Sequence, residues 1–159
     1  MDLEGHSIDV VVDAANRSRH VVEGTILVMP VRIEQGRALY RPRDLVLPKE
    51  IESLGLSADF VHEQGERSSI SEYSTSELVA FGLGLAGNIS WDAAKTLAQY
   101  LIGRVQHLTG SSSGIIELRI ARFSRPDGAV TEDLCIKGPA NAETVEAIIR
   151  GLTGAEEDS

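Results

Sequence analysis

Three glycines, Gly82, Gly84 and Gly87, have the spacing of a loop that binds a dinucleotide. In such a loop the glycines let the backbone approach a pyrophosphate, and the helix that follows directs its N-terminus at the phosphates. The pattern also requires a strand before the glycines and an acidic residue at the end of the next strand. Arg122 and Phe123 stand where that acid is expected. The spacing alone leaves a nucleotide-binding sensor or enzyme as one alternative.

We predict instead that residues 76–87 form a helix. Residues 74–77, with the sequence STSE, place a hydroxyl three positions before a glutamate, which is typical of a helix N-terminus. Glycine costs about 1 kcal/mol relative to alanine inside a helix, so three glycines indicate a close backbone contact. Gly82, Ala86 and Gly87 would then form a smooth strip against a neighbour. We therefore expect Gly82→Leu to harm folding or assembly.

A second candidate for binding is the segment GRALYRPRD, residues 36–44, which contains three arginines around a tyrosine. Such a group can clamp a phosphate, a carboxylate or an acidic partner. The preferred interpretation is an edge strand that charge protects from aggregation. The residues predicted to contact a partner are Arg37, Tyr40, Arg41, Arg43, Gly82 and Ala86.

The sequence predicts no catalytic residue, no metal site and no cofactor. The four histidines are far apart, and none belongs to a cluster with zinc-ligand spacing. Asp59, His62 and Glu63 are the nearest approach to a ligand or acid–base cluster, and a solvated strand edge explains them as well. Cys135 is expected on the outer face of its strand beside Asp133 and Lys137, without the paired base that a nucleophile needs. The histidines are His6, His20, His62 and His107.

Composition sets further limits on the function. The chain has 159 residues and a formal net charge of −9, which disfavours general binding to nucleic acids or to anionic membranes. A single cysteine and an N-terminus without a signal peptide favour a reducing, cytoplasmic location. The longest apolar run, residues 78–87, is about half the length of a membrane-spanning helix, so we expect no standing membrane contact. Contact with lipid after a trigger stays open as an alternative.

The elements that position these residues fall into two groups. The first half contains strand candidates, and the second half contains a helix, a hairpin and another helix. This grouping predicts an α+β fold, with a largely antiparallel sheet and two or three helices packed on one face. We expect one domain over residues 1–154, β-rich over 1–74 and helix–hairpin–helix over 75–154, with a disordered tail at 155–159. The expected strands are 7–14, 21–33, 38–48, 58–64, 68–74, 115–123 and 130–138. The expected helices are one turn within 49–56, the segment 90–108 capped by Ser90 or Asn88, and the segment 141–152 capped by Asn141.

The second half also shows a family pattern. The stretch LVAFGLGLAGNISWDAAKTLAQYLIGRV is followed by the strand IIELRIARF, a turn with Asp127 and Gly128, a second strand, and the helix ETVEAIIRGL. Residues 78–152 thus resemble the C-terminal half of the effector-associated constant components, small proteins encoded beside effectors in bacterial conflict systems. The resemblance implies an adaptor or signal-coupling role and supplies no catalytic residues. We therefore expect a non-catalytic interaction module whose partner is another protein, either a second copy of the chain or an effector.

Overall fold

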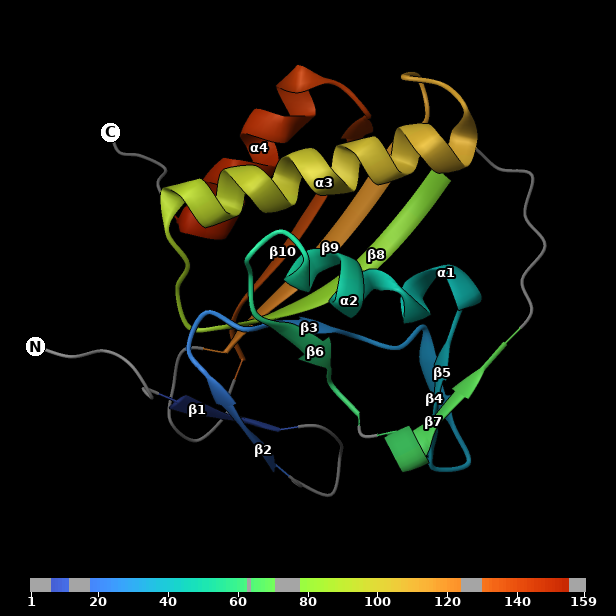
Figure 1. The fold of residues 1–159 in the computed structure, drawn as a ribbon, viewed down its shortest axis with the longest axis vertical. Helices are drawn as coiled ribbons and strands as arrows, with labels where there is room; N and C mark the ends of the chain where they lie inside the picture. The colour runs from blue at the N-terminus through green and yellow to red at the C-terminus, as the bar shows by residue number, and fades with distance from the viewer. Residues whose placement is uncertain (1–6, 12–17, 63, 71–77, 124–129, 155–159) are drawn as a thin grey trace, which may run out of the picture.

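The computed structural model describes residues 7–11, 18–62, 64–70, 78–123 and 130–154. In Figure 1 the longest helices lie above a mixed sheet, and smaller β-structures lie at the end of the molecule away from these helices. The elements in chain order are β1 (Ser7–Val11), β2 (Ser18–Val22), β3 (Ile26–Val28), β4 (Arg32–Glu34), β5 (Arg37–Tyr40), α1 (Pro42–Leu45), α2 (Leu47–Glu52), β6 (Ala58–Phe60), the 3-10 helix η1 (Gln64–Glu66), β7 (Arg67–Ser69), β8 (Leu78–Ala86), α3 (Trp91–Thr109), β9 (Ile115–Phe123), β10 (Val130–Pro139) and α4 (Ala142–Thr153).

The main sheet has five strands in the order β10-β9-β8-β3-β6. β8 lies at its centre, parallel to β9 and antiparallel to β3. β9 and β10 form the predicted antiparallel hairpin, and β3 pairs with β6 in parallel. Two smaller sheets, β1-β2 and β4-β5-β7, complete the described β-structure. The fold is α+β, as predicted.

One face of the main sheet is covered by α2, α3 and α4. Their apolar side chains form a continuous buried cluster with the inward-facing residues of β3, β5, β8 and β9. The cluster extends from Ile26 to Leu152, so both halves of the chain share one core. Each fully buried leucine or isoleucine in it contributes roughly 1.5 to 3 kcal/mol through removal of apolar surface from water.

The predicted long helices are confirmed, together with their caps. Ser90 Oγ accepts a hydrogen bond from Ala93 N at 3.1 Å at the start of α3. Asn141 Oδ1 accepts one from Thr144 N at 3.2 Å at the start of α4. Each bond satisfies a backbone donor that the first helical turn leaves without a partner. The sequence periodicity located these helices well because each buries one apolar stripe.

The predicted helix over residues 76–87 is wrong, because residues 78–86 form the central strand β8. Its side chains alternate with a period of two, the signature of a strand. Four large side chains point toward α3 and α4, and the glycines and alanines lie on the opposite face, which we call the outer face. Residues 74–77 lie outside the described residues. The inward-facing side chains are Val79, Phe81, Leu83 and Leu85, all buried.

Several of the predicted strands are also shorter than expected. The strand expected at 58–64 ends at Phe60, and the 3-10 helix η1 begins at Gln64. The strand expected at 38–48 ends at Tyr40, and Pro42 begins the short helix α1. Proline is accommodated there because the first helical residue needs no backbone N–H partner within the helix. The stretch 21–33 contains the end of β2, all of β3 and the start of β4, with a turn at Gly24, whose φ is +93°.

Candidate binding surface on the outer face of the sheet

The outer face of β8, β9 and β10 has small residues at its centre and polar residues at its edge. Strand pairing places Gly82 beside Arg119, and Arg119 beside Cys135. Together with neighbouring chain segments these strands enclose an open hollow of about 420 Å³, which we call the outer-face hollow. Its lining residues are Met29, Pro30, Gly82, Arg119, Ile120, Ala121, Asp133, Leu134 and Cys135.

The missing side chain of Gly82 keeps this hollow open. A Cβ atom there would meet only Met29 Cβ at 3.5 Å, an ordinary van der Waals contact. Gly84 differs, since an added Cβ would lie 3.0 Å from Phe123 Cε2. Phe123 thus packs directly over Gly84, within a small buried cluster that also contains Leu27. Of the two strand glycines, Gly84 is filled by packing and Gly82 remains available to a binding partner.

The walls of the hollow combine a guanidinium, a carboxylate and a thiol. The side chain of Arg119 is 73% exposed and forms an ion pair with Glu117 at 3.2 Å. Asp133 and Cys135 are exposed on the neighbouring strand, as the sequence predicted for Cys135. The Cys135 thiol lies 4.0 Å from a carboxylate oxygen of Glu117. This arrangement can hydrogen-bond and pair with charged groups of a partner, because guanidinium is a fork of five donors.

The turn at Gly87 is where a dinucleotide loop would hold its phosphates. Contrary to the sequence prediction, β8, α3 and β9 form a strand–helix–strand unit with parallel strands, the topology that such loops use. However, Gly82 and Gly84 lie within the strand, and only Gly87, with φ of +81°, lies at the turn.

Glu23 occupies the space that a phosphate would need beside Gly87. A Cβ atom on Gly87 would lie 2.5 Å from Glu23 Cγ and 2.6 Å from its Oε2. Asn88 N donates to Glu23 Oε2 at 3.3 Å, and Gly87 N donates to the Phe123 carbonyl at 2.7 Å. A phosphate here would meet a like charge and find both donors engaged. The geometry of the turn therefore does not provide an anion site.

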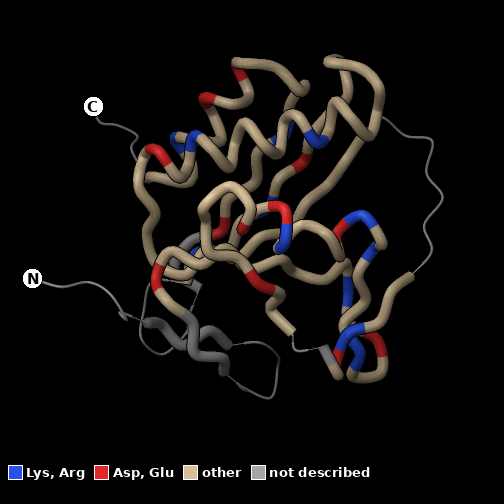
Figure 2. Tube along the Cα trace, viewed as in Figure 1, with Lys and Arg blue, Asp and Glu red and all other residues tan. Residues whose placement is uncertain are grey.

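The arginine-rich segment, residues 36–44, makes most of its contacts within the fold. Figure 2 shows basic residues concentrated in the part of the molecule that contains β4, β5, α1 and β7. Arg37 donates to the carbonyls of Gly65 and Arg67, each at 2.8 Å, and so ties β5 to β7. Tyr40 is fully buried, and its hydroxyl donates to the Val28 carbonyl at 3.0 Å.

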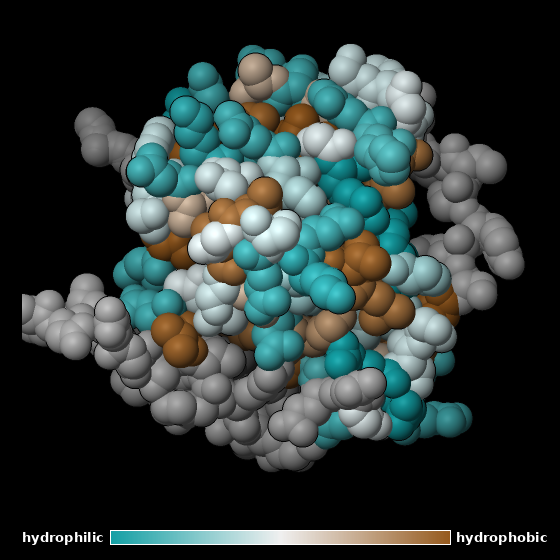
Figure 3. All heavy atoms as spheres, viewed as in Figure 1, coloured by the Kyte–Doolittle hydropathy of each residue, from teal (hydrophilic) through white to brown (hydrophobic). Residues whose placement is uncertain are grey.

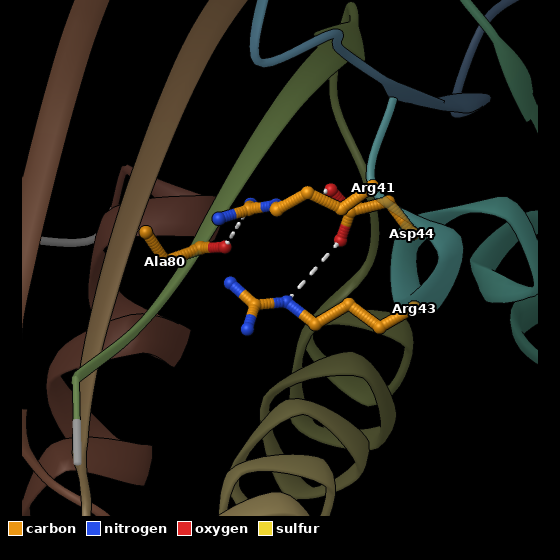
Figure 4. A network of polar contacts seen from close by, with 4 residues as sticks. All are labelled: Arg41, Arg43, Asp44 and Ala80. Carbon is orange, nitrogen blue, oxygen red and sulfur yellow. Dashed lines mark hydrogen bonds and ion pairs between the residues drawn. The ribbon is translucent and has the colours of Figure 1, made fainter. Parts of the chain in front are cut away.

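Arg41 and Arg43 converge on the buried carboxylate of Asp44 (Figure 4). Arg41 Nε donates to Asp44 Oδ2 at 2.9 Å, and its Nη2 donates to the Ala80 carbonyl on β8 at 2.6 Å. Arg43 Nε lies 3.9 Å from Asp44 Oδ1. The network thus fastens α1 to the central strand of the main sheet.

The predicted contact residues do not form one surface. Arg37 is exposed, and Gly82 lines the outer-face hollow, but Tyr40 and Ala86 are both fully buried. Asp59 accepts a hydrogen bond from Phe60 N, His62 is buried, and Glu63 lies outside the described residues.

The sequence did not predict the hollow, although the alternation within two of its strands was visible. The alternation within 115–123 and 130–138 placed Arg119 and Cys135 on outward faces. What it could not supply was the parallel pairing of β8 with β9, which brings Gly82 alongside. Among the described residues, no group of three or more His, Cys, Asp or Glu side chains could hold a metal ion.

Comparison with protein-family models, with curated proteins and with solved structures returns no match to this chain. Within the part of the chain that the structure describes, no helix has the length and apolar character needed to cross a membrane. The longest apolar run lies mainly in β8, which is hydrogen-bonded to a strand on each side. The face shown in Figure 3 carries several separate hydrophobic patches among hydrophilic residues.

Proposed function

We propose that this chain is a non-catalytic protein-interaction module, an adaptor that holds a segment of a partner protein in the outer-face hollow. The observation that carries the proposal is the outer-face hollow, which stays open at Gly82 because this residue has no side chain. Apolar groups of Met29, Pro30 and Ala121 line it, while Arg119 and Asp133 supply charge. An apolar centre with a polar rim is the common anatomy of a protein–protein interface.

The exposure of the hollow favours a protein segment over a small molecule as its occupant. Small-molecule sites bury some 70 to 90% of their ligand's surface. Here the Arg119 side chain is 73% exposed, and both Asp133 and Cys135 are open to solvent. A partner protein brings additional surface that can close over such an open site. A carboxylate of that partner is the natural counterpart for the Arg119 guanidinium.

The partner that we propose is an effector protein of a bacterial conflict or signalling system. This step rests on the resemblance of residues 78–152 to the effector-associated constant components. The same residues comprise β8, α3, β9, β10 and α4, which include the outer-face strands of the hollow.

Filling the hollow tests the proposal. Gly82→Val adds a side chain on the outer face of a strand, where valine is a favoured residue, so the variant should fold. We expect it to lose a partner captured by the tagged wild-type chain, with binding weakened about tenfold or more in calorimetry with the purified partner. Gly103→Ala is the control, since Gly103 lies on the exposed face of α3 with no atom within 4 Å of an added Cβ. Equal capture by wild type and Gly82→Val would contradict the proposal.

A nucleotide-binding sensor or enzyme is the second candidate, favoured by the parallel β8–α3–β9 unit. A thermal-shift screen with NAD, NADP, ATP and GTP separates the two functions. Because the Glu23 carboxylate fills the turn at Gly87, we expect no shift with any of the four. A shift that disappears in Gly84→Val would favour the nucleotide function instead.

A further inference from the structure

β10 is an edge strand of the main sheet. Among the described residues it pairs with β9 on one side, and no strand lies on the other. Its backbone N–H and C=O groups along that free edge form a template for another strand. We propose that two copies of the chain pair antiparallel through β10, about a twofold axis at Cys135, and join their sheets into one.

The charges of β10 select both the partner and the register. Asp133, Cys135 and Lys137 share the outer face at alternate positions. With the axis at Cys135, Asp133 of each copy lies directly opposite Lys137 of the second copy. An axis at Asp133 or at Lys137 would set like charges opposite each other. An axis at Leu134 or Ile136 would put Cys135 opposite a charge. Opposite charges in facing positions stabilise a strand pair and like charges destabilise it, so the axis at Cys135 is favoured.

Intrachain neighbours of these charges are compatible with this register. Lys137 faces Glu117 across the β9–β10 pair, and Asp133 faces Ala121. In the paired copies Lys137 would therefore lie between two carboxylates, Glu117 of its own chain and Asp133 of the second copy. Arg119, which faces Cys135, already has Glu117 as its ion-pair partner.

The inner face of β10 offers apolar surface to the same partner. Leu134 and Ile136 are half-buried beneath α4, and the chosen axis puts Leu134 opposite Ile136 of the second copy. A twofold axis perpendicular to the sheet keeps the α4 helices of both copies on one face. α4 packs closely on β10, since a Cβ on Gly151 would lie 2.3 Å from Leu134 Cδ2.

The pairing has defined ends. Pro139 at the C-terminal end of β10 has no backbone N–H to donate, and the β9–β10 register shifts between Val130 and Glu132. These features restrict the new strand pair to residues 132–138, which are symmetric about Cys135. A self-complementary patch of this kind forms a closed twofold dimer rather than an open chain of molecules.

Charge reversal tests the dimer directly. Light scattering of the reduced wild-type protein should give twice the 17.1 kDa of one chain at high micromolar concentration. Asp133→Lys and Lys137→Asp each create two like-charge pairs and should raise the dimer Kd about tenfold. The double variant Asp133→Lys/Lys137→Asp restores both opposite-charge pairs and should recover the dimer. An equimolar mixture of the two single variants restores the opposite-charge pairs between copies and should form a heterodimer.

Cys135 supplies an independent readout. Facing residues of antiparallel strands have Cα atoms about 4.5 or 5.5 Å apart, and both values are within the range for a disulfide. Oxidation with diamide takes two electrons and two protons from the two Cys135 thiols, forms one S–S bond and yields the hydrazine. Because the chain has one cysteine, a crosslinked dimer can only join Cys135 to Cys135. Rapid crosslinking should occur in wild type and in the double variant, and should slow in each single variant.

The dimer does not depend on the proposed effector contact, and different variants test the two. Gly82→Val should lose the effector partner and keep the dimer, whereas Lys137→Asp, which lies outside the lining of the hollow, should lose the dimer. A wild-type chain that remains monomeric at high micromolar concentration would overturn the inference. A dimer that is insensitive to both charge reversals, or that the double variant does not recover, would also overturn it.

Discussion

The three glycines of the 82–87 segment should respond to alanine in three different ways. Gly82 lies over the open hollow, Gly84 lies under Phe123, and Gly87 sits in a left-handed turn against Glu23. If all three glycines belonged to one ligand-binding loop, each alanine variant would weaken ligand binding. Their free energies of unfolding would then follow no particular order. The structure instead predicts that the stability of the alanine variants decreases from position 82 to 84 to 87.

The magnitudes follow from the space and the backbone conformation at each position. Gly82→Ala should raise the free energy of unfolding by about 0.5 to 1 kcal/mol, because alanine loses less backbone entropy in a strand. Gly84→Ala has the same gain, but a Cβ at 3.0 Å from Phe123 Cε2 forces the ring to move, at a cost of roughly 1 to 3 kcal/mol. A net destabilisation between zero and about 2.5 kcal/mol is expected there.

Gly87→Ala should be the most destabilising of the three. A non-glycine residue in the left-handed region costs about 1 to 2 kcal/mol. The new Cβ would also displace the Glu23 side chain, whose hydrogen bond to Asn88 N contributes about 0.5 to 1.5 kcal/mol. The combined loss is about 1.5 to 3.5 kcal/mol, which lowers the melting temperature of a chain of this size by roughly 3 to 14 °C.

Urea unfolding followed by circular dichroism measures all three variants, and a double-mutant cycle isolates the contact. In a Glu23→Ala background, Gly87→Ala should cost only the backbone strain of about 1 to 2 kcal/mol. A neutral Gly87→Ala variant would contradict this order, as would a series in which Gly82→Ala is the most destabilising change. An unchanged cost of Gly87→Ala without Glu23 would show that the carboxylate does not fill the turn.

Three further predictions concern other parts of the fold. Asp44→Ala removes a buried carboxylate from two arginines and should destabilise the chain by about 3 kcal/mol in urea unfolding. The control is Glu34→Ala, which breaks an exposed ion pair and should change stability by less than about 0.5 kcal/mol. Gly103→Ala should raise the free energy of unfolding by about 0.5 to 1 kcal/mol, because the position is an exposed helix interior; a lower melting temperature would contradict this. Burial, followed by the hydrogen bond to Glu50, raises the pKa of Tyr100, so the stability difference between wild type and Tyr100→Phe should hold below pH of about 10 and decline at higher pH, as paired urea titrations can show.

The sequence by itself determined the elements whose signals are local. The strands at 115–123 and 130–138 alternate apolar and polar residues, and the helices at 90–108 and 141–152 repeat with a helical period. Each signal arises because one face of the element is buried and the other is solvated. Side chains within three residues of the helix starts supply the caps, so they too could be predicted without knowledge of the tertiary structure.

The central strand β8 could not be predicted from the local pattern of apolar and polar residues. Every residue from 78 to 86 is apolar or glycine, so no contrast between faces reveals the period. The hydroxyl and glutamate of residues 74–77 then favoured a helix. β8 is a strand because β3 and β9, which are distant in sequence, satisfy its backbone on both sides. Those hydrogen bonds exist only in the folded chain.

The candidate site depended on tertiary structure for the same reason. Met29, Gly82, Arg119 and Cys135 come from four separate segments, and strand pairing places them in one row across the sheet. The outward positions of Arg119 and Cys135 could be predicted from alternation within each strand. Which strands are neighbours, and in which register, is decided by long-range hydrogen bonding and by packing of the core beneath α3 and α4. The order of residue types along the chain does not directly reveal which strands pair or in which register.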